Sequence, residues 1–326
     1  VSDCAQLDFQ HVLGQHAVKR ALEIAAAGGH NILLSGPPGS GKSMMAKRFP
    51  TILPPLSDKE RLEVIRVWST IGKGQQAAAR AERPFRAPHH NSSANAIAGG
   101  TGTAGRLPTP GEITLAHCGV LFLDELPEFH RDVLETLRQP LEDGRVTISR
   151  VAGQVTYPAA FQLIAAMNPC KCGWYGTSRC TCSQTSVQQY LRRLSGPLLD
   201  RIDLQVAVQP VEYAALASRG KTHEESSADI RARVTAVRAL QYARQGEAVC
   251  NAQIPASLLA EMCPLSEQAS AMFAAAFERL GLTARAHDRV LRTARTIADL
   301  AGSETIEVEH LAEALQYRSI DRAAGG

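Results

Sequence analysis

The residues with the clearest potential for chemistry form the loop Gly36-Pro-Pro-Gly-Ser-Gly-Lys-Ser43. It follows the apolar run Ile32–Leu34 and precedes a segment compatible with a helix. Between a strand and a helix, such a loop turns backbone N–H groups toward one point, where they cradle phosphate oxygens. Lys42 would reach the β- and γ-phosphates, and the Ser43 hydroxyl would bind Mg²⁺. A glycine-rich turn without a ligand is the alternative, which the complete pattern disfavours.

The expected nucleotide contacts are the loop residues and the first residue beyond them: Gly36, Pro37, Pro38, Gly39, Ser40, Gly41, Lys42, Ser43 and Met44. The other half of such a site follows Val120–Leu123, a short apolar run typical of a strand buried on both faces. Asp124 at the end of this strand could hold the water shell of Mg²⁺, and Glu125 could act as general base toward an attacking water. Helix caps or solvated loop residues are the alternative for carboxylates alone. Together with the phosphate loop, the pair predicts hydrolysis of ATP by water.

The composition is that of a compact, cytoplasmic protein with no membrane span. The chain has 326 residues, 44% of them hydrophobic, and a net charge of +3 that does not by itself imply nucleic acid. No apolar run approaches the length of a membrane-spanning helix. The chain begins with the polar segment from Val1 and lacks an initiating Met, so we expect no signal peptide and a fragment or a processed form.

Two domains are expected. Residues 1–210 alternate apolar strands with amphipathic segments, the pattern of an α/β, doubly wound parallel sheet. Helices are predicted over 18–27 and 133–141, and a further strand over 161–167. Residues 211–326 are predicted to form a small helical domain, because apolar residues recur there at helical spacing. These are Ile230, Val234 and Val237, then Val290, Ala294, Ile297 and Ala301.

Two segments exceed what a simple α/β domain requires. Residues of about 72–112 form a long Gly- and Pro-rich insertion, and such insertions are functional or disordered. Further on, Arg145–Arg150 and Val155–Tyr157 are β-rich runs around Gly153, which predicts a hairpin.

Four of the eight cysteines lie in a Gly-, Ser- and Thr-rich loop over about 169–186, as two Cys-x-Cys pairs. Four thiolates can form a closed tetrahedral Zn²⁺ site that fixes a loop with little core. The usual spacing is Cys-x₂-Cys, so the pattern departs from the common one, and free intracellular thiols are the alternative. The possible zinc ligands are Cys170, Cys172, Cys180 and Cys182.

In its motifs the chain resembles the Mg-chelatase-like branch of the AAA+ ATPases, and within it the ComM/YifB competence protein family. The resemblance covers nearly the whole chain, and on its motifs we expect this chain to lack the Lon-protease-like domain that the family usually carries before the ATPase module. The matching stretches are 8–15, Arg83-Pro-Phe-Arg-Ala-Pro-His-His90, Gly111–His117, Leu123–Phe129, Leu137–Glu142, Asn168–Cys170 and Leu194–Asp203.

This resemblance implies roles for further residues. Asn168 is similar to sensor 1, Arg201 to the arginine finger inserted into a neighbouring subunit, and Arg285 to sensor 2 of the helical lid. Arg289 and Arg292 are rivals for the last role, a turn asparagine is the alternative for Asn168, and a salt bridge to Asp200 or Asp203 is the alternative for Arg201. The segment expected to line the adenine pocket, or simply to pack in the core, is Val12, Leu13 and Gly14.

The resemblance also implies a homo-oligomeric ring, most simply a hexamer, because an arginine supplied in trans completes the site of a neighbour. In related rings the insertion and the hairpin point into the pore. DNA translocation or branch migration in natural transformation is therefore the expected function, and surface salt bridges are the alternative role of the basic residues. A magnesium-chelatase motor subunit and a protein remodeller are the rival functions. The candidate DNA contacts are Arg83, Arg86, His89, His90, Arg145 and Arg150.

Overall fold

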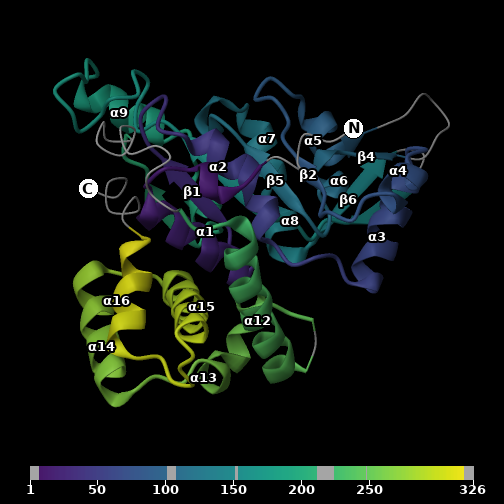
Figure 1. Ribbon diagram of the computed structural model, residues 1–326. Helices are drawn as coiled ribbons and strands as arrows, with labels where there is room; N and C mark the ends of the chain where they lie inside the picture. The colour runs from purple at the N-terminus through teal and green to yellow at the C-terminus, as the bar shows by residue number, and fades with distance from the viewer. Residues whose placement is uncertain (1–6, 101–107, 151–152, 211–223, 247, 319–326) are drawn as a thin grey trace. The chain divides into compact units, whose positions relative to one another are not determined.

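The structure, a computed structural model, describes residues 7–100, 108–150, 153–210, 224–246 and 248–318 (Figure 1). The chain divides into two compact units. The first comprises residues 1–33, 39–54 and 202–326, and the second comprises 34–38 and 55–201. The chain therefore passes between the units more than once, whereas the sequence predicted one boundary after residue 210. Among the described residues, no helix combines the length and apolar character that a membrane crossing requires.

A five-stranded sheet has the strand order β2-β5-β8-β1-β9. The second unit holds β2 (Phe85–Arg86), β5 (Val120–Leu123) and β8 (Gln162–Met167), which pair in parallel. Strand β1 (Ile32–Ser35) is divided between the units, and β9 (Leu204–Ala207) belongs to the first. All residues of β5 and β8 are buried, as expected for a parallel sheet covered on both faces. The predicted α/β class is confirmed.

Strand β2 corrects the expectation that residues of about 72–112 form one continuous insertion. Phe85 and Arg86 pair with Val120 and Leu121 at the edge of the sheet, and the Phe85 ring stacks on Phe122 with centroids 6.2 Å apart. A strand of two residues is too short to show an alternating pattern, so no sequence pattern predicted it.

Around these strands, the second unit contains short helices and two small antiparallel pairs. The helices are α3 (Asp58–Ser69), α4 (Gly74–Ala78), α5 (Ala94–Ala98), α6 (Glu112–Leu115), η4 (Leu126–Glu128), α7 (Arg131–Thr136), α8 (Arg138–Asp143), α9 (Gln184–Leu191) and α10 (Gly196–Leu199). Strands β3 (Gly99–Gly100) and β4 (Thr109–Pro110) form one pair. The predicted hairpin is present as β6 (Arg145–Arg150) and β7 (Gly153–Pro158), with Ile148 opposite Val155.

The single helix predicted over 133–141 is wrong in one respect, because α7 and α8 are separate and Leu137 lies between them. Pro140 explains the break. Proline has no N–H to donate to the carbonyl four residues earlier, so the hydrogen-bond ladder of one continuous helix is interrupted at Thr136.

The first unit is mainly helical. Val18 and Leu22 belong to the buried face of α1, which extends the predicted 18–27 by a few residues at its ends. The predicted face of Ile230, Val234 and Val237 is buried in α12. The helices of the first unit are η2 (Phe9–His11), α1 (His16–Gly28), α2 (Lys42–Arg48), η3 (Phe49–Ile52), α12 (Ser227–Gln245), η5 (Asn251–Gln253), η6 (Ala256–Leu258), α13 (Leu259–Met262), α14 (Glu267–Leu280), α15 (Ala284–Leu300) and α16 (Val308–Gln316).

The C-terminal helices of the first unit pack on one another, with α16 against both α14 and α15 (Figure 1). Val290, Ala294 and Ile297 of α15 are buried, as their helical spacing predicted. Ala301 is exposed, because it caps the end of α15 and does not continue its apolar face.

Candidate functional site

The phosphate loop lies between β1 and α2, as its pattern predicted. Gly39 and Gly41 have φ values of 78° and 90°, a region that favours glycine. No heavy atom lies within 4 Å of the position that a Cβ on Gly39 would take, so the loop leaves open space there. Lys42 is buried, with its Nζ 3.4 Å from the Ser40 hydroxyl. An open glycine turn beside a buried lysine suits a phosphate group.

In the second unit, several polar groups share one edge of the sheet. The N–H of Gly36, the first loop glycine, donates to the Met167 carbonyl at the end of β8 at 3.2 Å. Because β5 and β8 run in parallel, Asp124 and Asn168 follow strand ends at the same edge. The structure thus brings together three of the predicted elements: the start of the phosphate loop, the acidic pair and Asn168.

Glu125 has an unusual backbone and a specific partner. Its φ is 54°, in the left-handed region that costs a non-glycine residue roughly 1–3 kcal/mol and that recurs at functional sites. His90 Nδ1 lies 3.1 Å from the Glu125 carboxylate, whose side chain is 52% exposed. His90, predicted to contact DNA, therefore lies against the predicted general base. Sequence reasoning missed this pairing, because no local pattern relates the two residues.

In the first unit, Glu224 contacts the segment Val12–Gly14, which the sequence predicted to line the adenine pocket. The Gly14 N–H donates to Glu224 at 2.9 Å, and Lys19 Nζ contacts both Glu224 and the Val12 carbonyl at 2.5 Å. Burial alone would raise the pKa of Glu224, but the hydrogen bonds from Lys19 and Gly14 hold it below its usual range. Val12 is buried and Leu13 half-buried, which agrees with the packing alternative for this segment.

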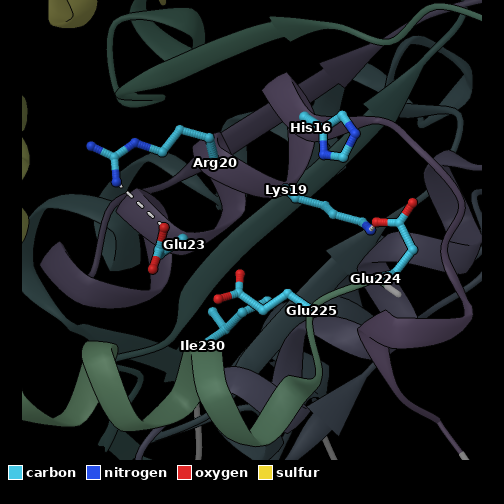
Figure 2. A pocket seen from close by; sticks show the side chains of 7 residues that line it. All are labelled: His16, Lys19, Arg20, Glu23, Glu224, Glu225 and Ile230. Atoms are coloured by element: carbon cyan, nitrogen blue, oxygen red, sulfur yellow. Dashed lines mark hydrogen bonds and ion pairs between the residues drawn. The ribbon is translucent and has the colours of Figure 1, made fainter. Parts of the chain in front are cut away.

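A cavity of about 310 Å³ adjoins the Lys19–Glu224 pair (Figure 2). Its lining contains none of the phosphate-loop residues and is mostly charged, with the Arg20–Glu23 ion pair on one side. The lining therefore contains none of the predicted phosphate contacts. Its lining residues are His16, Lys19, Arg20, Glu23, Glu224, Glu225 and Ile230.

The three arginines considered for sensor 2 differ sharply in their surroundings. Arg289 donates to Asp203 at 2.6 Å, and Arg292 donates to the Ile254 carbonyl at 2.9 Å. Arg285 is exposed in the first turn of α15 and takes part in none of the ion pairs within the described residues. A cation at a helix N-terminus is electrostatically unfavourable. Within the described part of the chain, Arg285 is thus the one of the three whose guanidinium makes no hydrogen bond or ion pair.

Arg201 lies two residues beyond Leu199, the last residue of α10. Its guanidinium pairs with Glu142 and donates to the Pro197 carbonyl at 2.7 Å. The sequence offered Asp200 or Asp203 as alternative partners, but Asp203 is occupied by Arg289. The Glu142 side chain is 58% exposed, whereas that of Arg201 is only 13% exposed.

The candidate DNA contacts separate into two groups. Arg83 pairs with Glu60 at 2.7 Å, and Arg86 pairs with Glu112 at 2.5 Å, so both match the salt-bridge alternative. Arg145 on β6 is exposed and belongs to none of the ion pairs among the described residues. His89 is exposed, and its ring lies 4.1 Å from that of His90. The Arg150 side chain lies outside what the structure describes.

The four cysteines of the predicted zinc loop converge. Their sulfur atoms all lie within 4.8 Å of one another. Backbone N–H groups of Thr181 and Trp174 donate to Cys172 and lower the pKa of its thiol to about 5.

Residues 8–216 match the family model described as magnesium chelatase, subunit ChlI, and residues 224–318 match the model of the ChlI C-terminal region. The chain belongs to the magnesium chelatase subunit ChlI family. The resemblance drawn from the motifs is therefore confirmed.

Relatives within and beyond this family were also found. The chain is 45% identical to the uncharacterized protein YifB of Salmonella typhimurium over 98% of its own length, and 45% identical to the competence protein ComM of Haemophilus influenzae over 97%. It spans 62% and 61% of these two proteins. Lon protease 2 of Bacillus subtilis is 30% identical over 42% of the chain and 26% of its own length.

Proposed function

We propose that the chain is the ATP-hydrolysing motor module of a ring-forming AAA+ ATPase. The observation that carries the proposal is the sheet edge of the second unit, where the start of the phosphate loop, the Asp124–Glu125 pair and Asn168 follow neighbouring strands. Ligands bind at the carboxyl ends of strands in open α/β sheets. The left-handed backbone of Glu125 adds a strained residue at this edge.

Each side chain then has a defined task. The loop N–H groups and Lys42 hold the phosphates, and Glu125 accepts a proton from the attacking water. Asn168 orients that water, and His90 holds the Glu125 carboxylate in position. The Ser43 hydroxyl and the Asp124 carboxylate are hard oxygen donors of the kind that Mg²⁺ requires. Bound Mg²⁺ would neutralise charge on the phosphate oxygens.

Two substitutions test this proposal. Lys42→Ala should abolish retention of ATP, whereas Glu125→Gln should retain ATP but lower turnover by at least about 10²-fold, since it removes the base. Glu128→Gln is the matched control, because Glu128 is an exposed acid in η4 that pairs with Arg193. Phosphate release and filter retention of labelled ATP provide the measurements. Wild-type turnover in the Glu125→Gln variant would refute the assignment.

For the substrate of the motor we propose DNA, moved by a homo-hexameric ring in branch migration. Two observations support this choice: a relative that matches nearly the whole chain is a competence protein, and the β6–β7 hairpin presents the exposed Arg145. Arginines in a channel bind phosphates without reading sequence, and such binding weakens steeply with salt. The insertion of Mg²⁺ into a porphyrin is the second candidate, favoured by the family description.

The two candidates differ in what stimulates hydrolysis. The ATPase rate is measured with single-stranded, forked or duplex DNA, and with porphyrin in their place. DNA should stimulate the rate, and the stimulation should decline as salt rises. Arg145→Ala should weaken it, whereas Arg86→Ala, in which the removed cation is paired with Glu112, should retain it. Stimulation by porphyrin alone would favour the chelatase.

A further inference from the structure

Four cysteines of the second unit converge in the loop between β8 and α9, and the proposed hydrolysis makes no use of them. The Cys170 sulfur lies 3.3 Å from that of Cys172 and 4.0 Å from that of Cys180. The sulfurs of Cys172 and Cys180 are 3.7 Å apart, and Cys182 lies within the same cluster. A tetrahedral zinc with Zn–S bonds of about 2.3 Å places its sulfurs about 3.8 Å apart. The cluster therefore already has nearly the dimensions of a zinc site.

The loop that carries these residues has few other means of holding its shape. Between β8 and α9 the described chain has no helix or strand, and half of its residues are exposed. Two glycines, Gly173 and Gly176, have φ values of 83° and 85°, so the loop turns tightly. Cys170 is fully buried, whereas the other three cysteines are half-buried. A short, polar loop of this kind gains its stability from a crosslink or a metal rather than from a core.

We propose that Cys170, Cys172, Cys180 and Cys182 bind one Zn²⁺ in a closed, tetrahedral, structural site. All four positions of the metal are filled by sulfur, which leaves no place for a water or substrate. The bound thiols are deprotonated, so binding releases protons to solvent and involves no change in oxidation state.

The metal would also steady the phosphate loop. A Cβ on Gly173 would come within 2.5 Å of Pro38 Cδ, so the backbone of the cysteine loop lies directly on the start of the phosphate loop. Cys170 follows Asn168 by only two residues. By fixing the cysteine loop, the zinc therefore restricts the movement of Pro38, which the loop contacts. It also restricts the chain that follows Asn168. This second consequence rests on the proposed function, whereas the metal site itself does not.

Metal analysis of protein purified without chelator tests the site. One zinc per chain is expected in the wild type and in Cys250→Ser, which alters a cysteine outside the cluster. The double variant Cys172→Ser/Cys180→Ser should contain none. Cobalt substituted into the wild type should give the charge-transfer absorption of a tetrahedral thiolate complex. Absence of metal from the wild type, iron in place of zinc, or paired disulfides on thiol titration would each overturn the proposal.

Nucleotide affinity tests the bracing role separately. Wild-type protein stripped of zinc under reducing conditions should bind ATP several-fold more weakly than the loaded protein, and added zinc should restore the affinity. Unchanged affinity after stripping would overturn the bracing role. If zinc-loaded protein binds no ATP at all, the proposed function fails while the metal site stands. Circular dichroism of the stripped protein verifies that the rest of the fold is retained.

Discussion

Arg285 and Arg289 lie one turn apart on α15, yet their surroundings assign them different tasks. Asp203 is buried and accepts from Arg289 and from the Asn31 N–H, with His30 beside it at 3.7 Å. Removing one partner of a buried ion pair leaves an uncompensated charge and costs about 3–5 kcal/mol. Arg289→Ala should therefore lower the free energy of unfolding by about that amount.

Arg285→Ala is the matched control on the same helix. Because Arg285 is exposed, its removal should change stability by no more than about 0.5 kcal/mol. If Arg285 reaches the nucleotide, the variant should nevertheless lose ATP turnover. Urea unfolding followed by circular dichroism, with ATPase rates measured alongside, separates the two effects. A stable Arg289→Ala protein would contradict the structural role of the pair.

The Asp203–Arg289 pair also gives stability a defined dependence on pH. Burial alone would raise the pKa of Asp203, but the charge of Arg289, the nearby His30 and the hydrogen bond from the Asn31 N–H hold it well below its usual range. A folded-state pKa below the unfolded value of about 3.9 means that this stabilisation is complete at neutral pH. It is lost as the pH falls below about 4 toward the folded-state value. In the Arg289→Ala variant, the free energy of unfolding should therefore fall less steeply as the pH is lowered through this acid range.

At the scale of elements, the edge strand β2 depends on close approach of two backbones. The Val120 N–H donates to the Pro84 carbonyl at 2.8 Å, and a Cβ on Gly119 would lie 2.0 Å from that oxygen. Gly119→Ala should therefore push β2 away from β5 and destabilise the fold by about 1–3 kcal/mol, the usual cost of overpacking. Thermal unfolding measures the effect.

Gly196→Ala is the control for this substitution, because no atom lies within 4 Å of its Cβ position and it begins α10. Its stability should stay within about 0.5 kcal/mol of the wild type. Equal stabilities for Gly119→Ala and Gly196→Ala would show that β2 can move without cost.

The elements that the sequence predicted are those with a strong local signal. Buried runs such as Val120–Leu123 identified β5, β8 and β1, and β-rich segments around Gly153 identified the hairpin. The phosphate loop was predictable because its chemistry is encoded in adjacent residues. Strand β2 was missed because two residues cannot display a period, and the break between α7 and α8 was missed although Pro140 marked it.

Contacts between distant residues could not be predicted in the same way. The His90–Glu125 pair and the Asp203–Arg289 pair join residues 35 and 86 positions apart, and neither has a local pattern. Sequence placed His90 and Arg86 together as DNA contacts because they are neighbours in one motif. The fold separates their tasks, since Arg86 pairs with Glu112 while His90 lies against Glu125.

At the scale of the whole molecule, the proposed ring requires that Arg201 act in the site of a neighbouring subunit. Its present partner Glu142 is exposed, so water can solvate that carboxylate when Arg201 turns to a nucleotide phosphate. Arg201→Ala and Glu125→Gln should each be inactive alone. Mixed in equal amounts, they should regain part of the wild-type turnover, because an Arg201→Ala subunit keeps its Glu125 and can receive arginine from a Glu125→Gln neighbour.

The mixing experiment distinguishes a trans arginine from a local one. If Arg201 served only its own subunit, every subunit in the mixture would lack one essential group and turnover would stay at the level of the single variants. Wild-type turnover per subunit should in addition rise with protein concentration, as dilute monomers assemble and complete one another's sites. Recovery in the mixture together with this concentration dependence would support the ring. A monomeric mass with constant turnover per subunit would exclude it, because no neighbour would then be present to supply Arg201.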